Sequence, residues 1–148
     1  MIRNSILFLV AFITLQSCSV EPQPISYGAD GCDFCKMNIV EQQYGSELVS
    51  EKGKVFKFDA TECMLNFKLQ NTTANWAFEM VTDYDTPEKL INANGSFVLR
   101  SKKLPSPMGA YLTSTASKEA ALKLQEKFGG TIYSYAELSE KFKQLPKW

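Results

Sequence analysis

The sequence contains no histidine, and this absence removes several kinds of chemistry at once. Ser-His-Asp and Cys-His nucleophilic catalysis both need an imidazole base, so neither is available in its usual form. Histidine-ligated zinc and copper(II) sites are excluded for the same reason. A metal site in this chain must therefore use sulfur, carboxylate, backbone or water ligands.

An excess of positive charge is also missing, because 16 lysines and arginines are balanced by 16 aspartates and glutamates. A nucleic-acid-binding protein would show a basic stripe, and a polybasic membrane surface would show a cluster of lysine and arginine. We therefore expect no nucleic-acid partner. Of the 148 residues, 45% are hydrophobic and 22% are charged, which is typical of a globular protein.

A long apolar run is the third missing feature. Residues 6–15 are apolar except for Thr14, and this stretch is too short to span a bilayer, which takes about 20 residues. One positive charge, Arg3, precedes it, and small residues follow, as is typical of a secretory signal peptide. The segment Leu15-Gln16-Ser17-Cys18 resembles a lipobox, the cleavage site of bacterial lipoproteins, which implies cleavage before Cys18 and acylation of Cys18.

These features predict three parts of the chain. Residues 1–17 are expected to be a lipoprotein signal peptide, residues 18–30 a lipid-anchored spacer rich in proline and small polar residues, and residues 31–148 the folded metal-binding domain. The protein is then expected in the cell envelope, anchored to the inner or the outer membrane and facing the periplasm. An ordinary signal peptide with an incidental cysteine is the alternative.

The pattern of apolar and turn residues predicts an α+β fold. Helices are expected at residues 60–70, at 118–128 before Gly129-Gly130, and from Ser134 to Pro146. The pairs Asp59 with Glu62 and Ser134 with Glu137 have the spacing of capping boxes. Strands are expected at residues 36–41, 46–51, 54–58, 76–81, 96–100, 110–113 and 131–133. Each half then contains one small ββαβ-type unit with antiparallel strands.

Sulfur side chains gather in a few short segments. Cys32 and Cys35 form a C-x-x-C pair, Met37 follows two residues later, and Met108 lies in a proline-bounded loop of the second half. Thiolates together with thioethers are the ligands that copper(I) prefers. Cys35 and Met37 point to the same side of a locally extended chain, so both can reach one ion. Met108 could close such a site from the other half.

Two more sulfur residues, Cys63 and Met64, lie on the first predicted helix. Met64 follows the apolar pattern of that helix, which favours a place in the core. Cys63 is also favoured as a buried core residue, since free cysteine is among the most buried residue types. A disulfide between Cys63 and Cys32 is the alternative.

These segments together resemble the NosL family, whose members are lipoproteins that deliver copper(I) during maturation of nitrous oxide reductase. The matching segments are Cys32-Asp-Phe-Cys35-Lys-Met37, Phe58-Asp59 followed by Cys63-Met64, and Ser106-Pro107-Met108-Gly109. The resemblance implies two ββαβ-type units, related to the metal-binding fold of organomercurial lyases. It also implies copper(I) held chiefly by Cys35 and Met37, with Met108, Met64, Cys63 or water as the third ligand.

The sequence therefore predicts a binding and transfer protein rather than an enzyme: an exported copper(I) chaperone. Its expected metal ligands are Cys35, Met37, Met108 and Cys32. Its expected partners are the copper ion, a membrane through the lipid on Cys18, and a client metalloenzyme or the transporter that assembles it. The alternative function is an extracytoplasmic thiol–disulfide oxidoreductase that uses Cys32 and Cys35. A structural zinc site is less favoured, because three thiols without histidine fall short of four ligands.

Overall fold

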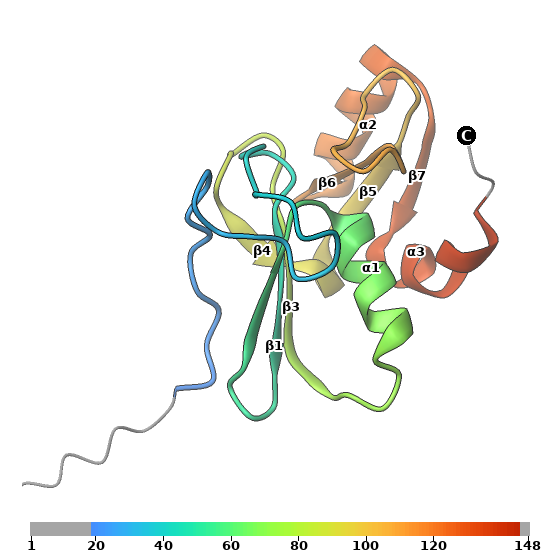
Figure 1. The fold of residues 1–148 in the computed structure, drawn as a ribbon. Helices are drawn as coiled ribbons and strands as arrows, with labels where there is room; N and C mark the ends of the chain where they lie inside the picture. Colours follow the sequence, from blue (N-terminus) through green and yellow to red (C-terminus); the bar gives the residue numbers. More distant parts are fainter. Residues whose placement is uncertain (1–18, 146–148) are drawn as a thin grey trace, which may run out of the picture.

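Two antiparallel sheets and three α-helices make up residues 19–145, the part of the chain that the computed structural model describes (Figure 1). The first sheet has the strand order β2-β1-β3-β4 and the second has the order β6-β5-β7. The strands of the first sheet are β1 (Ser46–Ser50), β2 (Val55–Phe58), β3 (Trp76–Thr82) and β4 (Leu90–Asn92). Those of the second are β5 (Phe97–Arg100), β6 (Leu112–Thr115) and β7 (Thr131–Ser134).

The helices give both halves the same topology. Helix α1 (Thr61–Gln70) joins β2 to β3, and α2 (Lys118–Phe128) joins β6 to β7. Helix α3 (Tyr135–Lys141) follows β7 and continues as η2 (Phe142–Gln144), while η1 (Ala93–Gly95) links the two halves. Each half is thus a strand–strand–helix–strand unit whose first strand lies at the centre of its sheet. The predicted α+β fold with two antiparallel ββαβ-type units is confirmed.

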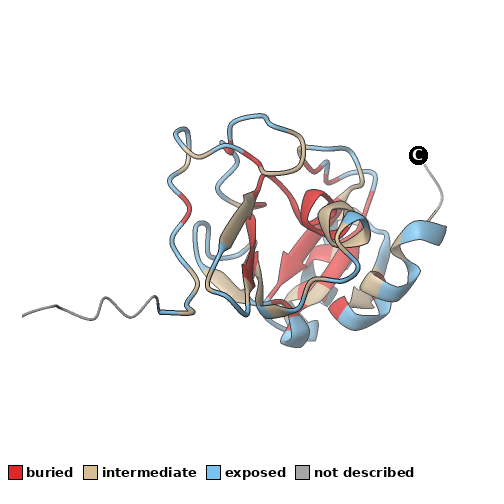
Figure 2. Ribbon diagram, turned by 60° about the horizontal axis from the view of Figure 1, so that its bottom comes forward, coloured by how far each residue is buried: buried red, intermediate tan, exposed pale blue. Residues whose placement is uncertain are grey.

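A shared core joins the two units. Helix α1 packs on one face of the first sheet, where the ring of Phe67 lies 4.9 Å from that of Phe56 and 5.2 Å from that of Phe58, measured between centroids. The same buried cluster includes Val98 and Leu112 of the second sheet. Buried segments of both units meet in the interior (Figure 2). The first turn of α1 therefore lies at the junction of the units, a position that matters for the site.

The other face of the first sheet is covered by the segment that precedes the folded units. Glu47 and Lys57 are directly opposite each other on β1 and β2, so their side chains share that face. The Glu47 carboxylate accepts a hydrogen bond from the Gln23 backbone at 2.9 Å, and the Lys57 ammonium donates to the Pro24 carbonyl at 2.8 Å. Lys57 also pairs with Asp30 at 2.7 Å. The spacer expected over residues 18–30 is thus bound to the sheet from Gln23 onward; its lipid anchor stays a prediction.

Three local predictions were wrong. Residues 36–41 form no strand: Asn38 makes only an isolated bridge with Gly31, because the chain turns back at Lys36, where φ is 66°. Asp59 does not cap α1, whose N-cap is Ala60 without a side-chain hydrogen bond. Residues 90–92, which were not among the predicted strands, form strand β4.

Two boundaries are instructive. The strand expected at 110–113 is β6, two residues later, because Tyr111 has a φ of 63° that no strand accommodates. The capping box of Ser134 and Glu137 is confirmed at the start of α3.

Among residues 19–145, no helix combines the length and the apolar composition needed to cross a membrane. The predicted signal peptide and Cys18 lie outside the described residues.

Candidate metal centre

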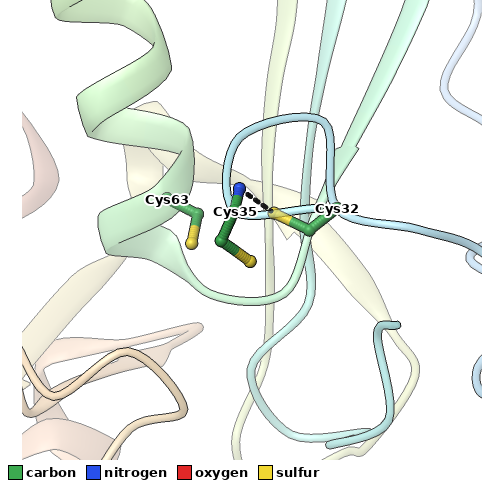
Figure 3. Close-up of side chains that lie close together, drawn as sticks. All are labelled: Cys32, Cys35 and Cys63. Atoms are coloured by element: carbon green, nitrogen blue, oxygen red, sulfur yellow. Dashed lines mark hydrogen bonds between the residues drawn. The ribbon is translucent and has the colours of Figure 1, made fainter. Parts of the chain in front are cut away.

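Three cysteine sulfurs converge where β2 ends and α1 begins. Cys32 and Cys35 come from a turn in the N-terminal segment, and Cys63 comes from the first turn of α1 (Figure 3). The three Sγ atoms lie within 4.8 Å of one another. All three cysteines are free in the described structure, so the disulfide considered for Cys32 and Cys63 is not formed.

Backbone hydrogen bonds place the turn that carries Cys32 and Cys35. The Asp33 backbone donates to the Lys57 carbonyl at 2.8 Å, and the Asp33 carboxylate accepts from the Lys57 backbone at 2.9 Å. The turn itself is closed by the Cys32 N–H, which donates to the Met37 carbonyl at 2.8 Å. Since Lys57 lies one residue before the end of β2, these bonds hold the C-x-x-C pair against the start of α1.

Cys32 is the ionised member of the cluster. Its pKa falls from 9.0 to about 5, chiefly because the Cys63 thiol donates a hydrogen bond to its sulfur. The backbone N–H groups of Asp59, Cys35 and Phe34 lower the pKa further, and together with the Cys63 bond they outweigh the burial of this side chain, which is 1% exposed. Figure 3 shows the bond from the Cys35 nitrogen, 3.4 Å from the Cys32 sulfur. Cys32 is therefore a thiolate at neutral pH, the form that binds metal.

The other two thiols keep their protons. The pKa of Cys63 is raised well above its usual range, first by the hydrogen bond it donates to Cys32 and then by burial. Burial also raises the pKa of Cys35, although the Met37 backbone N–H partly offsets this effect. A metal ion that binds all three sulfurs must displace these two protons.

A buried carboxyl adjoins the sulfurs. Asp59 is 2% exposed, and its pKa is raised to about 6 by burial first and then by the negative charge of Cys32. The Val40 backbone N–H lowers it, while Oδ1 has no hydrogen-bond partner within the described part of the chain. Asp59 is thus a second acidic group at the site rather than the helix cap that its position suggested.

The side chains of both predicted methionine ligands are exposed. Met37 is 53% exposed, directly after the turn of Cys32 and Cys35, and Met108 is 40% exposed in the loop before β6. That loop is attached to Glu62, the residue before Cys63. Met64 is fully buried in the core, as predicted. Of the expected ligands the structure thus brings Cys32 and Cys35 together, and the ligand roles of Met37 and Met108 stay predictions.

Sequence reasoning named Cys63 only as one of several possible third ligands, and the final list of expected ligands did not include it. The prediction that Cys63 is buried was correct, because this side chain is 1% exposed, but its place beside Cys32 and Cys35 was not predicted. A residue in the first turn of a helix that follows a strand directly stays near the end of that strand, and the Cys32 turn is bound to the same strand end. The position of Cys63 after Phe58-Asp59 was the signal that pointed to the site.

The spacing of the three sulfurs fits a three-coordinate ion. An ion about 2.3 Å from each of three thiolates, the distance found in zinc sites, would place the sulfurs about 4 Å apart. The three Sγ atoms already lie within 4.8 Å of one another, so only small movements are needed to reach this spacing. Without histidine, the donor set is soft, and soft ligands select ions such as copper(I).

Two comparisons with known proteins identify the fold and the family. The crystal structure of the copper chaperone NosL from Shewanella denitrificans resembles the fold, with a TM-score of 0.70 and 24% sequence identity over 80% of this chain and 96% of that chain. No curated protein matches in sequence. The sequence model of the NosL family matches residues 24–142, which include all three cysteines, Met37 and Met108. The chain belongs to the NosL family.

Proposed function

We propose that this chain is a copper(I) chaperone that holds one ion in its three-cysteine site and passes it to a copper enzyme. The observation that carries the proposal is the convergence of the Cys32, Cys35 and Cys63 sulfurs within 4.8 Å in a chain without histidine. The fold supports it, since it is that of a protein described as a copper chaperone. Such a protein binds and transfers its cargo and catalyses no reaction of its own.

The site favours ligand exchange. The Cys32 thiolate binds the incoming ion first, and Cys35 and Cys63 bind as their protons leave. Cys35 is the partly exposed sulfur of the three, whereas Cys32 and Cys63 are buried, so a partner's ligand replaces Cys35 first. The exposed thioethers of Met37 and Met108 serve as further donors at the edge of the site.

The client and the anchorage are finer parts of the proposal. The family resemblance supports delivery to nitrous oxide reductase or to the transporter that assembles it. The lipobox-like segment supports a lipid on Cys18 and a place in the cell envelope. A test of anchorage is metabolic labelling with a palmitate analogue: we expect label in the wild type and none in Cys18→Ser, and equal labelling of the two would reject the anchor.

One observation favours the alternative of a thiol–disulfide oxidoreductase, namely the low pKa of Cys32. An attacking thiolate must also be reachable, and Cys32 is only 1% exposed. Disulfide exchange by the wild type that depends on Cys32 and Cys35 but not on Cys63 would support this alternative.

Copper(I) binding is tested by anaerobic competition against a chromophoric chelator, with residues 19–148, five ligand variants and one control variant. We expect tight one-to-one binding by the wild type and the largest losses in Cys32→Ser, Cys35→Ser and Cys63→Ser. Smaller losses are expected in Met37→Leu and Met108→Leu. Met80→Leu, on β3, is the control and should bind as the wild type does. A reduced wild type that binds no copper(I), or that prefers zinc, would overturn the proposal.

A further inference from the structure

A buried carboxyl outside the sulfur cluster connects the two units. Glu62 lies between Thr61 and Cys63 in the first turn of α1, and 2% of its surface is exposed. Its Oε1 accepts a hydrogen bond from the Ser106 hydroxyl, which belongs to the second unit. Its Oε2 has no hydrogen-bond partner in the described residues. Burial of such a group is costly, so its position calls for an explanation beyond packing.

Outside α1, the hydrogen-bond partners of the Glu62 carboxylate all belong to one loop, residues 106–111. Oε1 also lies 3.4 Å from the Ala110 backbone nitrogen, and the Met108 N–H further favours the charged form of this carboxyl. The Ser106 hydroxyl in turn accepts the Tyr111 N–H at 2.8 Å. Both ends of the loop are therefore attached, directly or through Ser106, to a single side chain of α1.

This loop needs outside support to keep its shape. Gly109 has a φ of 74°, and Tyr111, which has a side chain, has a φ of 63°. A residue with a side chain in this region costs about 1 kcal/mol or more, and it persists where the surroundings fix it. The hydrogen bonds to Glu62 and Ser106 stabilise this backbone conformation in the loop that carries Met108.

We infer that Glu62 is a positioning residue of the metal site: it fastens the Ser106–Tyr111 loop to the helical turn of Cys63 and so holds Met108 beside the cysteine cluster. The inference rests on the proposed function, because it concerns the fourth sulfur offered to the copper(I) that the cysteines hold. Glu62 itself binds no metal in this arrangement. Its role is to join a ligand from the second unit to the three cysteines at the start of α1.

The first test needs no metal. Hydrogen exchange of the full-length, reduced chain in detergent is followed by mass spectrometry in the peptide that covers residues 106–111. Exchange should be faster in Glu62→Leu and Ser106→Ala, and close to wild type in Glu62→Gln, whose amide oxygen can accept the same bonds. Ser101→Ala is the matched control, because its hydroxyl binds the Phe128 carbonyl of the second unit and does not involve α1. Equal exchange in all variants would overturn the inference.

The second test measures copper(I) affinity by chelator competition in a double-mutant cycle. Loss of a residue that orients a metal ligand typically weakens binding about 10–100-fold, and we expect a loss in that range for Glu62→Leu. Met108→Leu should weaken binding in the wild type and in Glu62→Gln, but should add nothing in Glu62→Leu. X-ray absorption should show one copper–sulfur contact fewer in Glu62→Leu. An undiminished effect of Met108→Leu in Glu62→Leu would overturn the inference.

The two proposals fail in different ways. If the wild type binds copper(I) and Glu62→Leu binds it as tightly, only the positioning role is wrong. If the wild type binds no copper(I), the copper proposal fails. The positioning role then fails with it, even if hydrogen exchange shows that Glu62 stabilises the loop of residues 106–111. Circular dichroism checks that Glu62→Leu is folded. Ser106→Ala leaves α1 untouched and gives the same answer if Glu62→Leu does not fold.

Discussion

Replacing Cys63 by alanine should make Cys32 a weaker acid. In the wild type the Cys63 thiol donates the hydrogen bond that contributes most to the low pKa of Cys32, and alanine has no donor. The three backbone N–H groups that also stabilise the Cys32 thiolate remain in place, and burial continues to oppose ionisation. The pKa of Cys32 must therefore rise from about 5.

The size of the increase has a lower bound. The pKa of Cys32 falls by about four units, from 9.0 to about 5, while four hydrogen bonds lower it and burial raises it. Since the bond from Cys63 is the largest single cause of this decrease, we expect it to supply on the order of one pKa unit or more. Cys63→Ala should thus raise the pKa of Cys32 by about one unit or more, which corresponds to about 1.4 kcal/mol or more.

The assay is a pH titration of the reduced, metal-free protein by nuclear magnetic resonance, with ¹³C-labelled cysteine. The Cβ shift reports ionisation of each cysteine separately. Cys35→Ala is the comparison: its backbone N–H still donates to Cys32, and only the weaker hydrogen bond of its thiol to Cys32 is lost, so a smaller increase is expected. An unchanged pKa of Cys32 in Cys63→Ala, or an equal increase in Cys35→Ala, would refute the reasoning.

Three further predictions concern stability. The pKa of Asp59 is raised from 3.8 to about 6 by folding, so the stability that its protonated form contributes is present at acid pH and is lost as pH rises through about 6. In urea unfolding of the metal-free protein, the free energy of unfolding should therefore decrease with pH by about 3 kcal/mol less in Asp59→Asn than in the wild type. Parallel pH profiles of the two proteins would contradict this prediction. Gly130→Ala places a Cβ atom 2.2 Å from the Arg100 carbonyl oxygen at a φ of 105°, so it should destabilise by more than about 1 kcal/mol. Gly95→Ala, with open space around its Cβ, is the control in the same thermal melts. Copper(I) at about 100 times its dissociation constant should add about 2.7 kcal/mol of stability, which a chelator removes; an unchanged melting temperature would exclude specific binding to the folded state.

Local signals explain why the helices of the second unit could be predicted. Ser117 caps α2 through the Ala120 N–H, and Gly129, with a φ of 66°, ends it. The Ser134–Glu137 capping box opens α3 in the same local way. These signals act within a few residues, so the sequence carries them in full.

The parts that the sequence did not reveal depend on contacts between distant segments. An aspartate before a helix is normally a cap, but Asp59 offers its N–H to Cys32 and accepts from Val40 with its carboxylate. The nearness of Cys63 to the C-x-x-C pair likewise depends on how the Asp33 turn binds Lys57. Sequence spacing could therefore identify Cys32 and Cys35 as a pair, and only the tertiary arrangement adds the third thiol.

The binding of Gln23 to Glu47 also determines how far the protein can travel on its anchor. With the lipid on Cys18 that we propose, at most four residues, 19–22, separate the membrane from the first hydrogen bond to the sheet, where a free spacer would contain the twelve residues 19–30. When fully extended, a linker of four residues reaches about 14 Å and one of twelve residues reaches about 40 Å. With a linker of one third the length, the effective concentration of the folded domain at a partner within reach in the same membrane is about fivefold higher. In a lipid-anchored protein, the hydrogen bonds that attach residues 23–30 to the first sheet would thus also keep the metal site close to the bilayer, where it meets neighbouring membrane proteins more often than distant ones.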